Sequence, residues 1–317
     1  MRLVFLFLLG SFCLAQANID AVRLIQAVSD SARQTSTWQI EGSITRTGSD
    51  ATFALQMRTP NETRYEQRGG ATPALIVCDS SNAWLFFAPM QIFQKSPATG
   101  STICSPIVGE WKRLPEILES AKLAGKGKYT IDGKSAECQL VRGFSKPSLE
   151  SAGPLRRTLC IDRASETIVW EKTETKNSTE TYVYSHIVRG VEPPEGTFVF
   201  EAPLGSKPTD IQLLVPRRLG SPGVDRDPGK TPPHLISHVE PEYDQASHQA
   251  QIEGTVVLWV VIDGKGLPMD PIVQRSLSPG LDANAITAVK KWRFSPATKD
   301  GNPISIVATI EVNFRLR

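Results

Sequence analysis

A proline-rich stretch divides this chain into two parts. Hydrophobic periodicity fades between Pro203 and Pro233, and so many prolines favour extended, semi-rigid chain over collapse into a core. The 317 residues also exceed one small domain, since domains usually hold about 100–200 residues. We therefore expect a first domain at residues 18–203, a linker at 204–233 and a second domain at 234–317. The prolines are Pro203, Pro208, Pro216, Pro222, Pro228, Pro232 and Pro233.

The N-terminus has the pattern of a secretory signal peptide. Arg2 precedes an apolar run from Leu3 to Leu14, and Ala15-Gln16-Ala17 places small residues around a cleavage site. A membrane anchor is one alternative, but the run is shorter than the ~20 apolar residues that a spanning helix needs. A lipoprotein signal at Cys13 is another, but a bulky residue precedes that cysteine where a small one is required. We expect cleavage of residues 1–17 and export.

Removal of the signal leaves four cysteines, Cys78, Cys104, Cys138 and Cys160. An even number of cysteines in an exported protein indicates disulfides. Of the three possible connectivities, the pairs Cys78–Cys104 and Cys138–Cys160 close the shortest loops, each worth ~3 kcal/mol in the chain-entropy model. Zinc coordination by these cysteines is the alternative to disulfides, but no two cysteines have the close spacing that preorganises metal ligands. We expect these two disulfides and no metal site.

Charge and motifs argue against several functional classes. The 35 Lys and Arg residues nearly balance the 33 Asp and Glu residues, so the composition does not indicate the basic face that nucleic acids require. The sequence lacks G-x-S-x-G, a phosphate loop and a dinucleotide fingerprint. His234 and His238 have one-turn spacing, but no carboxylate or cysteine pair accompanies them at ligand spacing. We expect a protein that is not an enzyme, with no cofactor and no nucleic-acid partner.

The first domain has the pattern of a large antiparallel sheet. Helical spacing over Ile19–Ala32 gives way to alternating hydrophobic residues from Trp38 onward, which is typical of half-buried strands. A second helix is expected at Leu114–Leu123, after a proline-containing turn. Such a sheet needs its concave face covered. Further strands are expected at residues 63–67, 74–78, 83–87, 129–131, 138–143, 157–162, 167–172 and 181–188.

Four features of the first domain occur in the order of a known family. They are the helix before Trp38-Gln-Ile40, then Arg64-Tyr65, then Cys160-Ile-Asp162-Arg163, and a closing Val191-Glu-Pro-Pro-Glu-Gly-Thr-Phe198-x-Phe200. With these features the domain resembles the periplasmic lipoprotein-carrier superfamily that includes LolA. The resemblance implies a curved antiparallel half-barrel with helices around an apolar cavity for acyl chains; the alternative is a filled core. The residues expected to line the cavity are Trp38, Ile40, Phe53, Leu55, Met57, Trp84, Phe86 and Phe93.

The second domain combines a buried strand, helices and a half-exposed strand. Thr255–Ile262, TVVLWVVI, is a continuous apolar run typical of a strand covered on both faces. Helical spacing over Leu281–Trp292 and a short helix within Pro241–Ala250 predict two helices. In the last strand, Ile306, Ala308, Ile310, Val312, Phe314 and Leu316 alternate with Val307, Thr309, Glu311, Asn313, Arg315 and Arg317, which predicts one buried and one wet face.

Motifs across the second domain follow the order of a second family. They are Pro241-Glu-Tyr243, Gly254-Thr-Val256, Val261-Ile-Asp263-x-Gly-x-Gly266, Leu281-Asp282-x-x-Ala285, Trp292-Arg-Phe294-x-Pro296, Gly301-x-Pro303 and Val312-x-Phe314. With them, the domain resembles the C-terminal domain of TonB, the periplasmic energy transducer of Gram-negative bacteria. The resemblance implies two helices on a three-stranded antiparallel sheet. Asp244 departs from the family, which usually has proline there, and this affects the expected start of the first helix.

The TonB resemblance also implies a way of binding. Members commonly bind a short extended segment of an outer-membrane transporter by adding it as a strand to the sheet edge. The corresponding edge here is Ile304–Leu316, and the alternative is that a homodimer occupies it. The residues expected to form the partner-binding edge are Ile304, Ile306, Ala308, Ile310, Val312 and Phe314.

Together these patterns predict an α+β protein of the Gram-negative periplasm. An energy transducer has an uncleaved membrane helix, whereas this chain has a cleavable-looking signal and a folded domain before the linker. We expect it to bind outer-membrane or periplasmic protein segments by strand addition, in connection with outer-membrane transport. The alternative is a periplasmic lipid or lipoprotein carrier whose TonB-like domain docks it at the envelope.

Overall fold

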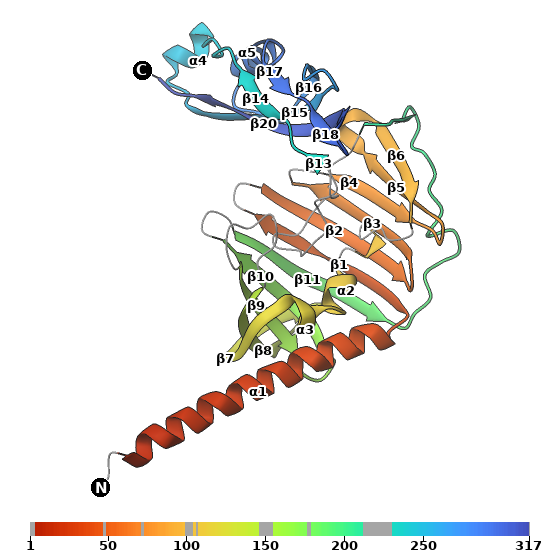
Figure 1. The fold of residues 1–317 in the computed structure, drawn as a ribbon, viewed down its shortest axis with the longest axis vertical. Helices are drawn as coiled ribbons and strands as arrows, with labels where there is room; N and C mark the ends of the chain where they lie inside the picture. Colours follow the sequence, from red (N-terminus) through yellow and green to blue (C-terminus); the bar gives the residue numbers. More distant parts are fainter. Residues whose placement is uncertain are drawn as a thin grey trace. The chain divides into compact units, whose positions relative to one another are not determined.

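The chain is an α+β protein in a computed structural model that describes residues 4–46, 49–70, 73–98, 104–105, 107–145, 155–175, 179–211 and 230–316, without the side chains of residues 4–17, 49 and 230. The described residues belong to two compact units (Figure 1). Those within 4–84 and 96–201 form the first unit, and those within 85–95, 202–211 and 230–316 form the second.

Alternating hydrophobic residues build one large sheet in the first unit. Within this unit its strands follow the order β5-β4-β3-β2-β1-β11-β10-β9-β8-β7, where β5 belongs to the unit only as far as Trp84, and the neighbours from β4 to β7 run antiparallel. This confirms the large antiparallel sheet. The bounds are β1 Thr37–Arg46, β2 Ser49–Arg58, β3 Glu62–Gly69, β4 Ala74–Cys78, β5 Asn82–Phe87, β7 Leu118–Ile131, β8 Lys134–Ser145, β9 Leu155–Asp162, β10 Thr167–Glu174 and β11 Thr179–Arg189.

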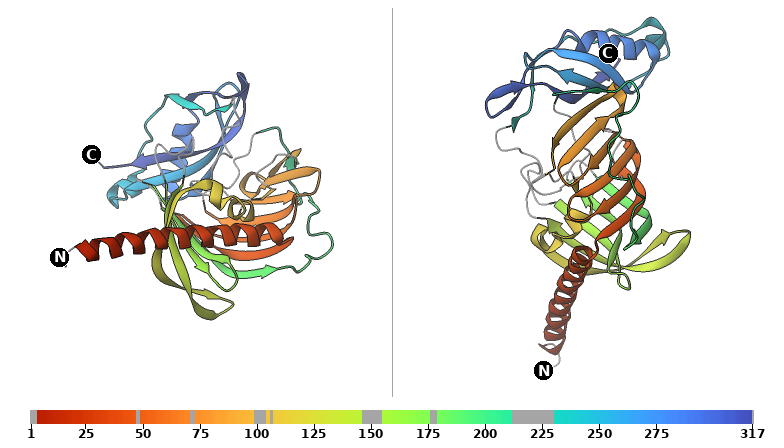
Figure 2. Two further views of the ribbon diagram at one scale, coloured as in Figure 1. Left: turned by 60° about the horizontal axis from the view of Figure 1, so that its bottom comes forward. Right: turned by 90° about the vertical axis from the view of Figure 1, so that its right-hand side faces the viewer.

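Helices α1 (Val4–Gln34), α2 (Val108–Trp111) and α3 (Leu114–Ile117) lie against one face of this sheet (Figures 1 and 2). In the predicted stripe of α1, Ile25, Val28 and Ala32 are buried but Val22 is 58% exposed, and α1 contacts α2, α3, β7 and β10. Helix α1 runs without a break through the expected cleavage position, and cleavage stays a prediction. Among the helices in the described part of the chain, none has the length and apolarity needed to cross a membrane.

The helix expected at Leu114–Leu123 is wrong beyond Ile117. Strand β7 begins at Leu118 and pairs with β8 along a long hairpin. The hairpin closes at Asp132-Gly133, whose φ angles of 50° and 73° are the left-handed values that tight hairpin turns need. Pairing that starts at this turn extends back past Leu123, because each added pair satisfies backbone donors and acceptors that a short helix leaves open.

Both expected disulfides are present in the structure. Cys138 of β8 and Cys160 of β9 join adjacent strands, with Cα atoms 5.5 Å apart. Cys78 of β4 is joined to Cys104, with Cα atoms 5.7 Å apart. Because Cys104 precedes α2, the Cys78–Cys104 disulfide links the segment that leads into α2 to strand β4 of the sheet.

The second unit is built around strand β15 (Gly254–Ile262), which lies between β16 (Pro268–Arg275) and β20 (Ile306–Phe314) in an antiparallel sheet. Every β15 residue from Val256 to Ile262 is buried, as the run TVVLWVVI predicted. Its helices are α4 (Gln245–Gln249) and α5 (Pro279–Val289). The core combines Val256, Leu258, Val260 and Ile262 with Leu281, Ala285, Val289, Trp292, Ile310, Val312 and Phe314.

Short strands flank this sheet and include both ends of the predicted linker. Strand β14 (His234–Ser237) pairs with β17 (Arg293–Ser295), and β18 (Ala297–Lys299) lies between β13 (Lys230–Thr231) and β19 (Asn302–Ile304). In the same unit, β12 (Lys207–Pro208) runs parallel to β6 (Ile92–Pro97), after the 3-10 helix η1 (Ala88–Met90). The rest of the predicted linker, 212–229, lies outside the described residues.

Candidate functional site

Strand β20 is a long, regular edge of the sheet in the second unit. It pairs with β15 through nine successive residue pairs, from Phe314 opposite Gly254 to Ile306 opposite Ile262, without a shift of register. Within the described residues no strand pairs with its other side. Since alternate backbone groups of an antiparallel strand point away from its neighbour, this edge presents a row of N–H and C=O groups.

Most of the residues predicted for this edge pack in the core of the second unit. Ile310, Val312 and Phe314 are buried in the core, and Ala308 packs against it. Their side chains hold the strand in place. The exposed side of the strand carries Thr309, Glu311 and Asn313, as the alternation predicted.

Two details of the predicted edge are wrong. Ile304 belongs to β19, opposite Ala297, because the chain first forms a hairpin through Asp300-Gly301. Val307 is buried, although the alternation placed it on the wet face. It lies opposite Val261, which is also buried, so both faces of the sheet are covered at this end. Ile306 is half-buried.

The opposite edge, β16, has features that oppose the addition of a strand. Its register against β15 shifts twice, and bulges of this kind disrupt the hydrogen-bond ladder. Pro268 and Pro271 provide no N–H donor, and Asp270 has a left-handed φ of 48°. Sheet edges with prolines and bulges are protected against pairing. The two edges therefore differ, and only β20 offers an uninterrupted ladder.

The end of β20 is fixed by the segment that leads into α4. The Tyr243 ring meets the Phe314 ring edge-on, with centroids 5.5 Å apart, and the Tyr243 hydroxyl donates to the Ile252 carbonyl at 3.2 Å. Desolvation, followed by the charge of Glu253, raises the pKa of Tyr243. The hydroxyl therefore stays protonated and keeps its role as a donor.

Asp244, which replaces the proline usual in the family, begins α4. Its Oδ1 accepts a hydrogen bond from the Ser247 amide at 3.0 Å, the contact expected of an N-cap residue. Hydrogen bonds from the Ser247 side chain and amide lower the pKa of Asp244, so the cap is charged at neutral pH. The departure from the family pattern thus replaces a rigid residue with a capping one.

Replacing Gly280 by alanine is expected to disturb this cap. A Cβ at position 280 would lie 2.4 Å from the Asp244 carboxylate, and we expect a loss of about 1–3 kcal/mol in the free energy of unfolding, as for other overpacked sites. Because serine is shorter and also caps helices, Asp244→Ser should relieve the clash. The free energies of unfolding of both single variants and the double variant, measured by denaturant titration, should show strong coupling. Additive effects would contradict this account.

The V-I-D-x-G-x-G and W-R-F motifs meet at one turn. Asp263 Oδ1 accepts from the amides of Lys265 and Leu267, both at 2.8 Å. Gly266 then lies against Phe294, whose amide donates to the Gly266 carbonyl at 3.0 Å. Gly266 has a φ of 77°, and a Cβ there would lie 1.8 Å from the Phe294 carbonyl oxygen. These motif residues therefore shape the domain that presents β20.

Five of the eight residues predicted to line an apolar cavity lie on one face of two neighbouring strands. Trp38, Ile40, Phe53, Leu55 and Met57 share one face of β1 and β2, where Trp38 is opposite Met57 and Ile40 is opposite Leu55. All five are buried. The other three lie elsewhere: Trp84 is half-buried and stacks on Phe200, while Phe86 and Phe93 belong to the second unit.

Aromatic rings pack against the shared face of β1 and β2. Trp111 of α2 meets Trp38 and Tyr184 edge-on, at centroid distances of 5.6 and 5.3 Å. Phe53 lies 6.0 Å from both Tyr65 and Tyr184. Trp111 of α2 therefore covers Trp38, and Phe53 packs among aromatic rings of the same sheet.

A buried ionic cluster beside these rings was missed from the sequence. Arg157 forms ion pairs with Glu110 of α2 and with Glu171, the latter at 2.8 Å. Glu171 also accepts hydrogen bonds from the Tyr184 hydroxyl at 2.5 Å and from the Trp111 indole at 3.3 Å. Strand alternation places Arg157 and Glu171 on the inward face, and this signal could have identified them.

The second unit is thus a small α+β domain with two helices on a three-stranded antiparallel sheet. Residues 239–316 match the family model described as Gram-negative bacterial TonB protein C-terminal, which confirms the resemblance found in the motifs. An 86-residue segment is 34% identical to protein TonB of Vibrio cholerae and covers 26% of this chain and 35% of that protein. The chain therefore spans about a third of the length of the curated relatives it matches.

Two solved structures are also similar to parts of the chain. The solution structure of the TonB C-terminal domain of Pseudomonas aeruginosa is 24% identical, covers 29% of this chain and 92% of its own, and has a TM-score of 0.22. The crystal structure of MucB is 13% identical, with coverage of 70% and 72% and a TM-score of 0.39. The resemblance of the first domain to the lipoprotein-carrier superfamily stays a prediction.

Proposed function

We propose that this protein is a periplasmic, TonB-related binding protein that accepts an extended segment of an envelope protein as a new strand beside β20, in connection with outer-membrane transport. It has no enzymatic role in this proposal. The observation that carries it is the difference between the two sheet edges: β20 offers nine regular residues, whereas β16 is bulged and contains two prolines. Main-chain hydrogen bonds would supply affinity for a partner of varied sequence.

Side chains along β20 favour certain partners. Glu311 is exposed between Thr309 and Asn313. Residues directly opposite each other in neighbouring strands interact, and opposite charges stabilise the pair by roughly 0.2–1 kcal/mol. The bound segment should therefore carry a basic or hydrogen-bond-donating residue opposite Glu311. This supports selectivity for a subset of extended segments.

Proline substitutions at two adjacent positions, Ala308→Pro and Thr309→Pro, test the edge. Successive N–H groups of a strand point to opposite sides, so one substitution removes an outward donor and the other removes a donor to β15. We expect the substitution that removes the outward donor to abolish peptide binding without changing the melting temperature. The substitution that removes a donor to β15 should lower the melting temperature. Binding is measured by fluorescence polarisation with short synthetic peptides from the periplasmic segments of outer-membrane transporters.

Two controls make the proline experiment decisive. Peptides N-methylated at alternate residues should fail to bind, because strand addition requires their amides. Light scattering of the native chain tests whether a homodimer occupies the edge instead; a dimer disrupted by the same proline would overturn binding of a foreign segment at this edge. Binding that survives both proline substitutions would also contradict the proposal.

Carriage of lipid or lipoprotein in the first unit is the alternative function, and it has less support. Five of the eight predicted lining residues, those of β1 and β2, are buried, and two of them, Trp38 and Phe53, pack against other aromatic rings. Native mass spectrometry of gently purified protein checks it. Bound acyl species that disappear when Trp38 is replaced by an ionisable residue would favour carriage over strand addition.

A further inference from the structure

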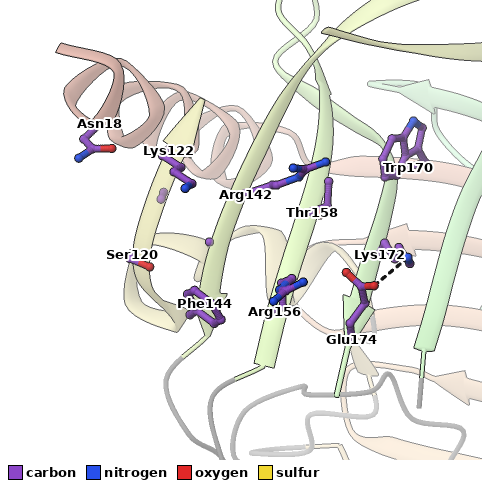
Figure 3. Close-up of a pocket in the computed structure, with 12 residues that line it drawn as sticks. Asn18, Ser120, Lys122, Arg142, Phe144, Arg156, Thr158, Trp170, Lys172 and Glu174 are labelled. Atoms are coloured by element: carbon purple, nitrogen blue, oxygen red, sulfur yellow. Dashed lines mark ion pairs between the residues drawn. The ribbon is translucent and has the colours of Figure 1, made fainter. Parts of the chain in front are cut away.

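Strands β7 to β10 of the first unit, together with Asn18 of α1, form a pocket of about 750 Å³ that has no part in the proposed strand addition (Figure 3). Arg157 and Glu171 point toward α2, so their neighbours in sequence, including Arg156 and Lys172, point to the other face of the strands. This second face forms most of the pocket. Its volume is in the range of sites for small ligands, about 300–1,000 Å³.

Positive side chains form a row across the pocket. Lys122 lies opposite Arg142, Arg142 opposite Thr158, and Thr158 opposite Lys172. Arg156 belongs to the next row, between Phe144 and Glu174. Cations placed directly opposite each other destabilise a sheet, so this arrangement disfavours folding unless an anion offsets it.

The cations of the pocket are mostly without acidic partners. Glu174 is the acidic residue among the lining side chains, and it pairs with Lys172 at 2.8 Å. In the described parts of the chain, Lys122, Arg142 and Arg156 have no ion pair. Since the whole chain has a net charge of only +2, this is a local concentration of positive charge.

Aromatic side chains flank the cations. Phe144 is 41% exposed on β8, next to Arg156. Trp170 is half-buried and packs against the cluster around Cys138, Cys160 and Val169. Exposed aromatic surface beside positive charge fits a ligand that has both an apolar part and an anionic part.

The Cys138–Cys160 disulfide prepares the pocket for binding. It joins β8, which carries Arg142 and Phe144, to β9, which carries Arg156 and Thr158. A covalent link between these strands limits their relative movement. The side chains therefore need little reordering when a ligand binds, and preorganisation of this kind increases affinity.

We propose that this pocket binds a phosphate ester attached to an apolar group, such as the headgroup of an anionic phospholipid. Neighbouring strands lie only about 4.8 Å apart, so cations on successive strands converge on one compact, multiply charged group. Acidic side chains along an extended peptide are spaced more widely and match this row less well. Arginine guanidinium groups donate two parallel hydrogen bonds to phosphate, and Phe144 contacts the apolar part.

The test uses the full chain and three probes: inorganic phosphate, dihexanoyl phosphatidic acid below its critical micelle concentration, and phosphatidylglycerol vesicles, with phosphatidylcholine vesicles for comparison. Titration calorimetry measures the first two probes and vesicle flotation the third. We expect binding of phosphatidic acid and of phosphatidylglycerol vesicles, and much weaker binding of inorganic phosphate. Because Arg142→Gln with Arg156→Gln removes two charged hydrogen-bond donors, it should weaken binding at least ~10-fold.

Matched variants separate a site from general attraction to charge. Lys128→Gln with Lys134→Gln removes the same charge from exposed positions of the same hairpin outside the pocket, and should leave affinity within about twofold. Phe144→Gln should weaken binding of phosphatidic acid but not of inorganic phosphate. Equal losses in both double variants, or tight phosphate binding that is indifferent to Phe144, would overturn the proposal. Circular dichroism checks folding, and the β20 proline variant with a native melting temperature should bind as the native chain does.

Discussion

Replacing Gly266 by alanine is expected to destabilise the second unit by ~4 kcal/mol or more, which places it among exceptionally large single substitutions. The new Cβ would lie 1.8 Å from the Phe294 carbonyl oxygen and 2.8 Å from its carbonyl carbon. Both are backbone atoms, so no side-chain rotation relieves the clash. The left-handed φ of 77° adds a further cost for any residue with a Cβ.

Gly264→Ala is the matched control, because it adds the same methyl group to the same turn. Its Cβ would lie 3.8 Å from Pro303, an ordinary contact distance, and the expected cost is below ~1 kcal/mol. Denaturant titrations followed by tryptophan fluorescence measure both variants, since Trp259 and Trp292 report on this unit. If Gly266→Ala and Gly264→Ala unfold at the same denaturant concentration, the close backbone contact is not a constraint on the fold.

The sequence predicted best those features that residues close together in the chain determine. The run Thr255–Ile262 predicted a strand buried on both faces because no polar residue interrupts it. Gly266 belongs to a motif because only glycine fits against Phe294. Five of the eight residues predicted to line a cavity share one buried face of β1 and β2, because strand alternation places them on the same side.

Other features depend on distant contacts and could not be predicted locally. The helical pattern at Leu118–Leu123 gave way to β7 because β8 provides a hydrogen-bonding partner. Ile304 left the last strand because the hairpin with β18 takes it first. The basic pocket is formed by four strands whose register becomes known only in the folded sheet, and the composition shows nothing of it because the charges of the whole chain nearly cancel.

Removal of the buried arginine, Arg157→Met, is expected to destabilise the first unit by about 3–5 kcal/mol, the usual result of removing one partner from a buried ion pair. Arg157, Glu110 and Glu171 are 1%, 4% and 1% exposed. Without Arg157, Glu110 and Glu171 lose the buried cation with which both form ion pairs. The substitution also removes the ion pair between β9 and Glu110 of α2.

A neighbouring arginine and a compensating substitution make this prediction specific. Arg156→Met changes the adjacent, exposed residue on the other face of β9 and should alter stability by at most ~0.5 kcal/mol. Adding Glu110→Gln to Arg157→Met removes one of the two buried carboxylate charges that Arg157 pairs, so it should recover part of the loss, whereas Glu110→Gln alone should destabilise the native protein. Thermal and denaturant unfolding of the four variants supplies the comparison. Equal effects of Arg156→Met and Arg157→Met, or a double variant less stable than both single variants, would mean that charge burial does not determine how α2 is held against the sheet.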